Sequence, residues 1–132
     1  MTPQRIQYLI ALVFFILGGW AMLFPQHVID TVFLPEYRIG GRILPFMMAC
    51  FGAQALLAGL FAAFARFTAT TFLVYGIALL PFFGFNYYFT FHDPVFTSMG
   101  LIDALGNIVM LLLCYAGWRK LRAAEQTDKQ RN

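Results

Sequence analysis

Four long apolar stretches dominate this chain and leave few folds open to it. They cover residues 6–24, 43–65, 67–91 and 96–118, and each is long enough to cross a bilayer as a helix. The first would rise about 28 Å, close to the thickness of the hydrocarbon core. Since lipid offers no partner to free backbone groups, each crossing segment is expected to be helical.

Composition supports the same interpretation. Hydrophobic residues make up 61% of the 132 residues and charged residues only 11%, so a soluble fold would have too few polar residues to cover its surface. We predict an all-α polytopic membrane protein, with a four-helix transmembrane bundle over residues 1–121 and a polar cytoplasmic tail over 122–132 that frays. No small-residue cleavage site follows the first stretch, which we interpret as a retained anchor.

Basic residues predict the orientation. After four crossings both termini lie on one side, which carries Arg5, Arg66 and the basic tail, whereas Arg38 and Arg42 lie on the other. Because cytoplasmic loops carry an excess of Lys and Arg, we predict cytoplasmic termini in a bacterial inner (plasma) membrane. The net charge is +3, and most of the basic residues lie near the C-terminus. Basic residues there suit a helix end that meets a lipid headgroup layer, so no nucleic-acid partner is expected.

The connections between the stretches differ in length. Only Arg66 separates the second stretch from the third, so these two are expected to pack as an antiparallel hairpin. The first outer connection, residues 25–42, is longer and contains an apolar face at helical spacing. We predict a short interfacial helix there, lying on the outer leaflet. Its apolar residues are Val28, Ile29, Val32, Phe33 and Leu34.

Small residues recur every fourth position in the second stretch, at Ala55, Gly59 and Ala63. Such a stripe lets another helix backbone approach closely. Packing inside the bundle and pairing in a homodimer both fit this pattern. The lipid bilayer, a second copy and another membrane protein are therefore the candidate macromolecular partners.

Asp103 is the only ionisable side chain well inside any of the four stretches. An acid at that depth is costly unless it is neutralised, paired or hydrated, so it marks a candidate functional site. Asn107 follows four residues later on the same helical face. Asn86 and Arg42 lie near the outer ends of the preceding helices. We expect these four residues at similar depth, where an ion pair between Arg42 and Asp103 would let the acid stay charged.

The depth of Asp103 depends on where the fourth helix begins. If Asp93 caps the helix and Pro94 is its first residue, Asp103 lies about 13 Å inside. If Thr97 or Ser98 is the cap, Asp103 lies nearer the interface and complements the helix N-terminus. A structural polar network and a ligand, ion or proton site both stay open.

Other side chains could contribute to a site in the outer half. Pro81 and the aromatic residues after it indicate either an interfacial belt or an aromatic-lined cavity. Gln54, deep in the second stretch, is either an interhelical contact or a polar contact in a cavity. The candidate ligand-binding residues are Asp103, Asn107, Asn86, Arg42, Gln54, Tyr87, Tyr88 and His92.

No motif of soluble-type catalysis is present, whether nucleophile elbow, P-loop, dinucleotide fingerprint or zinc-protease signature. His27 and His92 match no metal-ligand spacing, and Cys50 and Cys114 form no CxxC pair. We therefore predict no cofactor and no metal, and expect a protein that is not an enzyme.

Two short motifs resemble the DoxX-like group of small four-helix bacterial membrane proteins. They are Gly18-Gly19-Trp20 with Phe24-Pro25 at the end of the first stretch, and Arg38-Ile39-Gly40-Gly41-Arg42 before the second. The resemblance covers most of the chain as a layout and implies a four-helix bundle. Some relatives are linked to quinone-coupled sulfur oxidation, but no residues here carry that activity over.

These patterns favour a non-enzymatic membrane protein that binds an apolar or amphipathic ligand, or a partner membrane protein, through an outer-half polar and aromatic cavity. Two alternatives are a small proton-coupled transporter, with Asp103 as the titrating group, and a structural subunit of a larger membrane complex.

Overall fold

The structure of the protein, a computed structural model, describes residues 1–38 and 40–131. Four of its helices are long and apolar enough to cross a membrane, judged by length and composition. This confirms the predicted all-α fold with four such helices. In chain order the elements are α1 (Pro3–Leu23), α2 (Pro25–Val32), η1 (Pro35–Tyr37), α3 (Ile43–Phe64), α4 (Ala69–Tyr87), the π-helix η2 (Tyr88–His92), η3 (Ser98–Gly100) and α5 (Leu101–Arg131).

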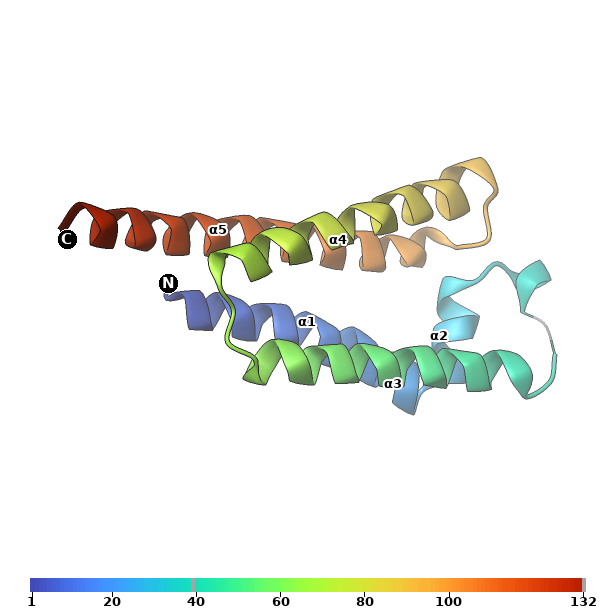
Figure 1. Ribbon diagram of the computed structural model, residues 1–132. Helices are drawn as coiled ribbons and strands as arrows, with labels where there is room; N and C mark the ends of the chain where they lie inside the picture. Colours follow the sequence, from blue (N-terminus) through green and yellow to red (C-terminus); the bar gives the residue numbers. More distant parts are fainter. Residues whose placement is uncertain (39, 132) are drawn as a thin grey trace.

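The long helices form two antiparallel pairs. Helix α1 packs along α3, α4 packs along α5, and α1 also contacts α5 (Figure 1). Both termini and the α3–α4 connection lie at one end, which we name the terminal end. Helix α2, η1, η2 and η3 gather at the other, which we name the loop end.

The predicted hairpin of the second and third stretches is wrong. Helices α3 and α4 are neighbours in sequence but scarcely touch, because α3 is packed on α1 and α4 on α5. Glycines explain this choice of partner, since a Cβ on Gly18 would lie 2.8 Å from the Ala55 Cβ, and one on Gly59 would lie 3.0 Å from the Phe14 Cβ. The small-residue stripe of α3 is therefore used inside the chain, against α1.

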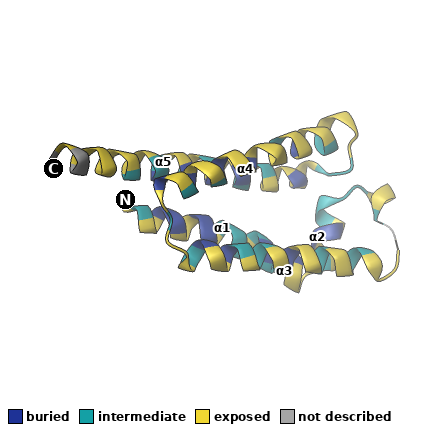
Figure 2. Cartoon of the chain, in the orientation of Figure 1, coloured by how far each residue is buried: buried dark blue, intermediate teal, exposed yellow. Residues whose placement is uncertain are grey.

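The terminal end of the bundle is filled by an apolar core from α1, α3, α4 and α5 (Figure 2). Ile6, Ile10, Phe72 and Cys114 are almost completely buried there. The side chain of Gln7 donates to the carbonyl oxygens of Ala63 at 3.3 Å and Ala65 at 2.5 Å, at the last turn of α3. Those carbonyls have no partner within their own helix, so Gln7 stabilises the α1–α3 pair at its terminal end.

The polar tail, for which the sequence predicted a frayed end, is helical in the structure. Helix α5 continues to Arg131 and extends beyond the other helices at the terminal end (Figure 1). From Arg122 onward the tail contains no glycine or proline and begins with strong helix formers, so nothing in its sequence stops the helix. Arg119 and Arg122 also stack over the rings of Tyr115 and Trp118.

The predicted helix in the first long connection is present as α2, but its apolar face does not lie free on a leaflet. Val28 and Ile29 are 6% and 1% exposed, because α2 packs against α1 and α3. The chain after α2 is also joined to the segment before α5. Leu34 N–H donates to Val95 O at 2.9 Å, and Thr97 N–H donates to Val32 O at 2.7 Å.

Thr97 connects these two segments and also begins the last helical region. Its hydroxyl donates to Thr31 O at 2.7 Å and accepts from Met99 N–H at 3.2 Å. We expect Thr97→Val to lower the free energy of unfolding by about 1–2 kcal/mol, because both hydrogen bonds are lost at constant side-chain shape. Thermal unfolding in detergent measures this, with Thr70→Val on the exposed side of α4 as the control. Equal unfolding temperatures of the two variants would contradict the assigned role.

Candidate functional site

A cavity of about 580 Å³ opens at the loop end, between the α1–α3 pair and the α4–α5 pair. We name it the loop-end cavity. Its wall is apolar and aromatic except for two side chains, Asn86 and Asp103. The apolar lining consists of Leu17, Trp20, Ala21, Val28, Val32, Phe33, Met48, Phe51, Pro81, Phe82, Phe85, Phe96, Met99, Gly100 and Ile102.

Asp103 is the centre of a small polar cluster on this wall. Asn86 Nδ2 donates to Asp103 Oδ2 at 2.9 Å, and Asn107 Nδ2 donates to the same oxygen at 3.0 Å. Asn86 Nδ2 also donates to Phe82 O at 2.9 Å, which fixes that amide on α4. We name Asn86, Asp103 and Asn107 the carboxylate–amide cluster. Three of the residues that the sequence placed at similar depth are therefore in direct contact.

Burial differs sharply within the carboxylate–amide cluster. Asn86 and Asn107 are only 7% and 4% exposed, whereas Asp103 is exposed and borders the cavity. A buried amide donor without an acceptor is costly, so the two asparagines hold the carboxylate in place. Both donate to Oδ2, and Oδ1 accepts no hydrogen bond from the part of the chain that the structure describes. The cluster therefore presents Asp103 Oδ1 as a hydrogen-bond acceptor at the edge of an otherwise apolar cavity.

The start of the fourth helix settles the depth of Asp103. Thr97 is the cap, η3 follows, and α5 begins at Leu101, so Asp103 lies in the first turn of α5. Of the two sequence alternatives, the later start is therefore the observed one, and Asp103 lies toward the loop end. A carboxylate there complements the positive end of the helix dipole. The hydrogen bond from Asn86 gives it a further role in joining α4 to α5.

The ion pair that the sequence suggested between Arg42 and Asp103 does not form. Arg42 is exposed at the residue before α3, and the described residues contain no ion pair between it and Asp103. Because α3 is packed on α1 and not on α4, its loop-end terminus is held on the other pair of helices. Amides, and not a guanidinium, stabilise the carboxylate.

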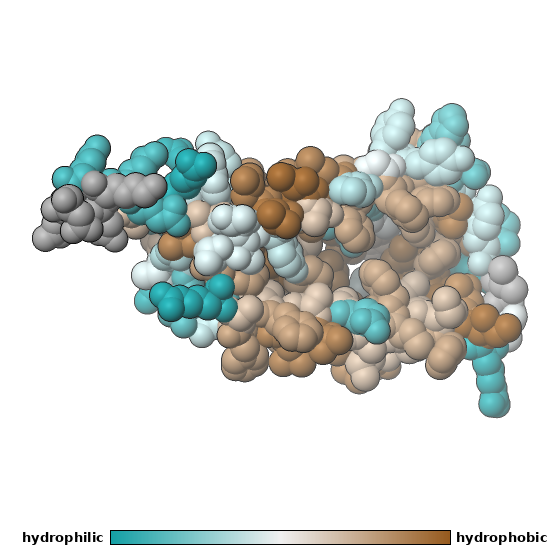
Figure 3. Space-filling model, viewed as in Figure 1, coloured by the Kyte–Doolittle hydropathy of each residue, from teal (hydrophilic) through white to brown (hydrophobic). Residues whose placement is uncertain are grey.

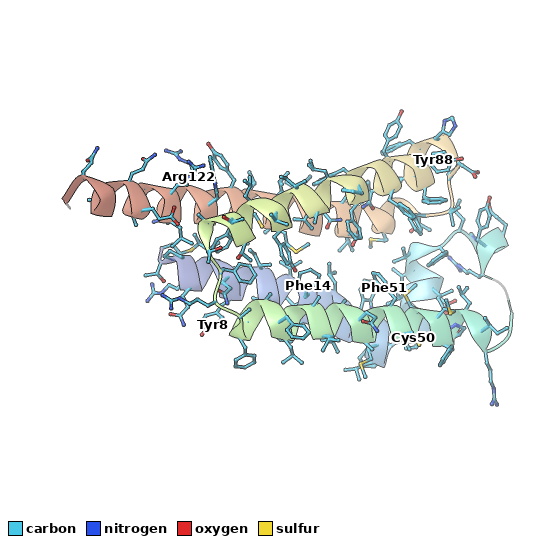
Figure 4. All side chains as sticks on the ribbon, in the orientation of Figure 1. Tyr8, Phe14, Cys50, Phe51, Tyr88 and Arg122 are labelled. Carbon is cyan, nitrogen blue, oxygen red and sulfur yellow. The ribbon has the colours of Figure 1, made fainter. Side chains whose placement is uncertain are left out.

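Four other candidates from the sequence lie outside the loop-end cavity. Gln54, Tyr87, Tyr88 and His92 are all exposed, and none of them belongs to its wall. The rings of Tyr88 and His92 pack 5.1 Å apart in η2, at the loop end of the molecule (Figure 4). The aromatic run after Pro81 is thus divided, since Phe82 and Phe85 line the cavity and the tyrosines do not.

Trp20 and the apolar face of α2 were missed as site residues. Trp20 lines the cavity, and its Nε1–H donates to His27 Nδ1 at 3.0 Å. Val28 and Val32 of α2 line the same cavity. Pro25 was the available signal, because a proline immediately after a crossing segment marks an abrupt end at which the chain can fold back.

Comparison of the chain with protein-family models, with curated proteins and with solved structures finds no match. The resemblance to the DoxX-like group stays a prediction. Among the residues that the structure describes, no group of three His, Cys, Asp or Glu side chains is placed to hold a metal ion. A functional interpretation depends on the geometry and chemistry of the loop-end cavity.

Proposed function

We propose that this chain is an integral membrane protein that binds an amphipathic small molecule in the loop-end cavity. The ligand's apolar body would lie against the aromatic wall, and a hydroxyl or amine on its head would donate to Asp103 Oδ1. One observation carries this proposal, namely a carboxylate held by two buried amides at the edge of an apolar cavity. Ligand sites commonly combine an apolar wall with a few convergent polar groups.

The surface supports placement in a bilayer. A hydrophobic band crosses the middle of the molecule, and hydrophilic residues gather toward both ends (Figure 3). Arg5, Arg66 and the basic residues of α5 are at the terminal end, whereas Arg38 and Arg42 are at the loop end. The excess of positive charge favours a cytoplasmic terminal end in a bacterial inner membrane, and hence a ligand site in the outer half.

Binding is favoured over proton-coupled transport by the core at the terminal end. A transported ion or molecule would need a polar route from Asp103 through the rest of the bundle. The residues in that direction are apolar and tightly packed, including Ile10, Phe72, Met110 and Cys114. This arrangement suits a site that opens from one side.

A non-enzymatic role is favoured by the surroundings of Asp103. Both histidines, His27 on α2 and His92 in η2, are exposed at the loop end, and neither borders the cavity. General acid–base catalysis needs titratable groups within hydrogen-bond reach of the reacting atoms, and Asp103 is the one such carboxyl or imidazole side chain on the described wall. The two amides that contact Asp103 cannot exchange protons with a substrate at neutral pH, so they suit a binding role.

Fluorescence of Trp20 provides a direct test, because this residue lines the cavity. The probe is a long-chain primary alcohol brominated at its far end, added to the Trp118→Phe variant in lipid nanodiscs. We expect saturable quenching of Trp20 at low alcohol-to-lipid ratios, since bromine in the cavity would lie close to the indole. The matching bromoalkane, which lacks the hydroxyl, should quench only in proportion to its concentration.

The control is the Trp20→Phe variant, which retains only Trp118 on α5, near the terminal end. Its quenching should rise linearly with the alcohol, as expected for partition into lipid. Identical quenching curves from the two single-tryptophan variants would exclude specific binding in the loop-end cavity.

A further inference from the structure

Gln54 is the one polar side chain in α3, and it lies in the middle of an otherwise apolar helix. It is exposed, and it takes part in no hydrogen bond within the described chain. A hydrophilic patch is visible inside the hydrophobic band over α3 (Figure 3). An amide facing hydrocarbon without a partner is costly, so its position on this side of α3 calls for a partner outside the chain.

Helix α3 is also the least covered of the four long helices. Only 11% of its most apolar 18-residue segment is buried inside the chain, compared with 22–33% of the corresponding segments of the other three helices. Its close neighbours are α1 and α2. The small residues that could have served another helix are already in contact with α1, as Gly52 and Gly59 demonstrate. Another interface on α3 must therefore use larger side chains on a different face.

The exposed residues around Gln54 follow a heptad pattern. Alternate steps of three and four residues connect Met47, Cys50, Gln54, Leu57, Phe61 and Phe64, all of which are exposed. We name this row the α3 seam. The spacing matches the contact positions of two helices that cross at about 20°, the commonest arrangement in membranes. A single polar residue in such an apolar row fixes the register and number of the paired helices.

We propose that the α3 seam pairs two copies of this chain about a two-fold axis along the bilayer normal, with the Gln54 amides hydrogen-bonded to each other. An amide both donates and accepts, so a second Gln54 is a complete partner for the first. The two-fold axis places it at the same depth without any further requirement. This proposal shares with the proposed function only the placement in a bilayer and does not depend on ligand binding.

Cys50 provides a reporter of this pairing, because it is exposed and lies one helical turn from Gln54 on the seam. Mild oxidation of the full-length chain in lipid should give a disulfide-linked dimer on a non-reducing gel, since the seam brings the two Cys50 side chains together. Cys114 is buried, so Cys114→Ala should retain the dimer band and Cys50→Ala should lose it.

A relocated cysteine controls for random collision. Leu12 is exposed on α1, so Leu12→Cys combined with Cys50→Ala places a thiol on another lipid-facing surface. Crosslinking of that variant should be weak at the same protein-to-lipid ratio. Crosslinking as efficient as that through Cys50 would overturn the assignment of the α3 seam.

Gln54→Leu tests the amide pair itself. We expect the dissociation constant of the dimer, measured by energy transfer during dilution in lipid, to rise roughly three- to tenfold. Gln126→Leu, the same change on the exposed tail of α5, should leave it unchanged. A dissociation constant unaffected by Gln54→Leu, or a chain that stays monomeric at all dilutions, would overturn the proposal. Saturable quenching of Trp20 by the brominated alcohol is expected whether or not the dimer forms. Failure of the dimer proposal can therefore be distinguished from failure of the proposed function.

Discussion

Replacing Asp103 with leucine should weaken binding of the brominated alcohol about tenfold or more. The carboxylate is the one charged acceptor on the cavity wall, and its Oδ1 is available to a ligand donor. A hydrogen bond to a charged group contributes about 1.5–3 kcal/mol, which corresponds to about a tenfold to hundredfold change in affinity. Saturable quenching of Trp20 in the Trp118→Phe background measures the change.

The same substitution should also destabilise the fold, because Asn86 and Asn107 lose their shared acceptor. A buried donor left without a partner costs about 1–3 kcal/mol. Asp103→Asn retains an acceptor oxygen, so it should preserve more of the stability while still weakening binding. These two variants together separate the effect on the ligand from the effect on the bundle.

The matched control for the charge is Asp93→Leu, because Asp93 is exposed at the loop end and does not line the cavity. Its affinity for the alcohol should equal that of the parent. Unchanged affinity in a folded Asp103→Leu variant would show that the carboxylate does not contact the ligand, and the proposed site would lose its polar contact.

Introducing leucine at Gly52 should prevent assembly of the folded bundle. A Cβ at this position would lie 2.7 Å from Gly18 O and 2.8 Å from Ala21 C, and it would also meet Met22 N. All three atoms belong to the backbone of α1, which cannot move aside as a flexible side chain can. The pair of α1 and α3 would have to separate, at a cost of more than about 3 kcal/mol.

Gly19→Leu is the matched control, since a Cβ there has no neighbour within 4 Å. We expect it to unfold near the temperature of the parent in detergent, while Gly52→Leu elutes as aggregate from a size-exclusion column. If Gly52→Leu instead gives a monodisperse protein with the unfolding temperature of Gly19→Leu, the close packing of α1 on α3 is wrong.

Local pattern predicted the helices and one part of the site well. The boundaries of α3 follow from an apolar run bounded by Gly40-Gly41 and Arg66, and Asn107 joins Asp103 because four residues bring them to one helical face. Asn86 was predicted from depth alone, and this succeeded because α4 and α5 are antiparallel neighbours joined by a short connection.

Predictions from the residue pattern within one segment failed wherever the position of a side chain depended on which face of its helix turns inward. Arg42 was grouped with Asp103 by depth, and Gln54 was considered as a polar contact in a cavity. Both are exposed, Gln54 on α3 and Arg42 at the residue before it, because α3 packs against α1. A helix that is apolar all around gives no periodic signal for its inner face. The choice was made by glycines such as Gly52, whose contacts come from a distant segment.

The sequence by itself determined that four helices of bilayer length form, and that a single acid lies within the last of the four apolar stretches. Both depend on composition and length along one segment, so no other segment is needed to fix them. Only the tertiary structure decided that α3 pairs with α1, that α2 folds over the cavity, and that two amides hold Asp103 at its edge. Those outcomes depend on the rotation of each helix about its axis, which close packing between distant residues sets.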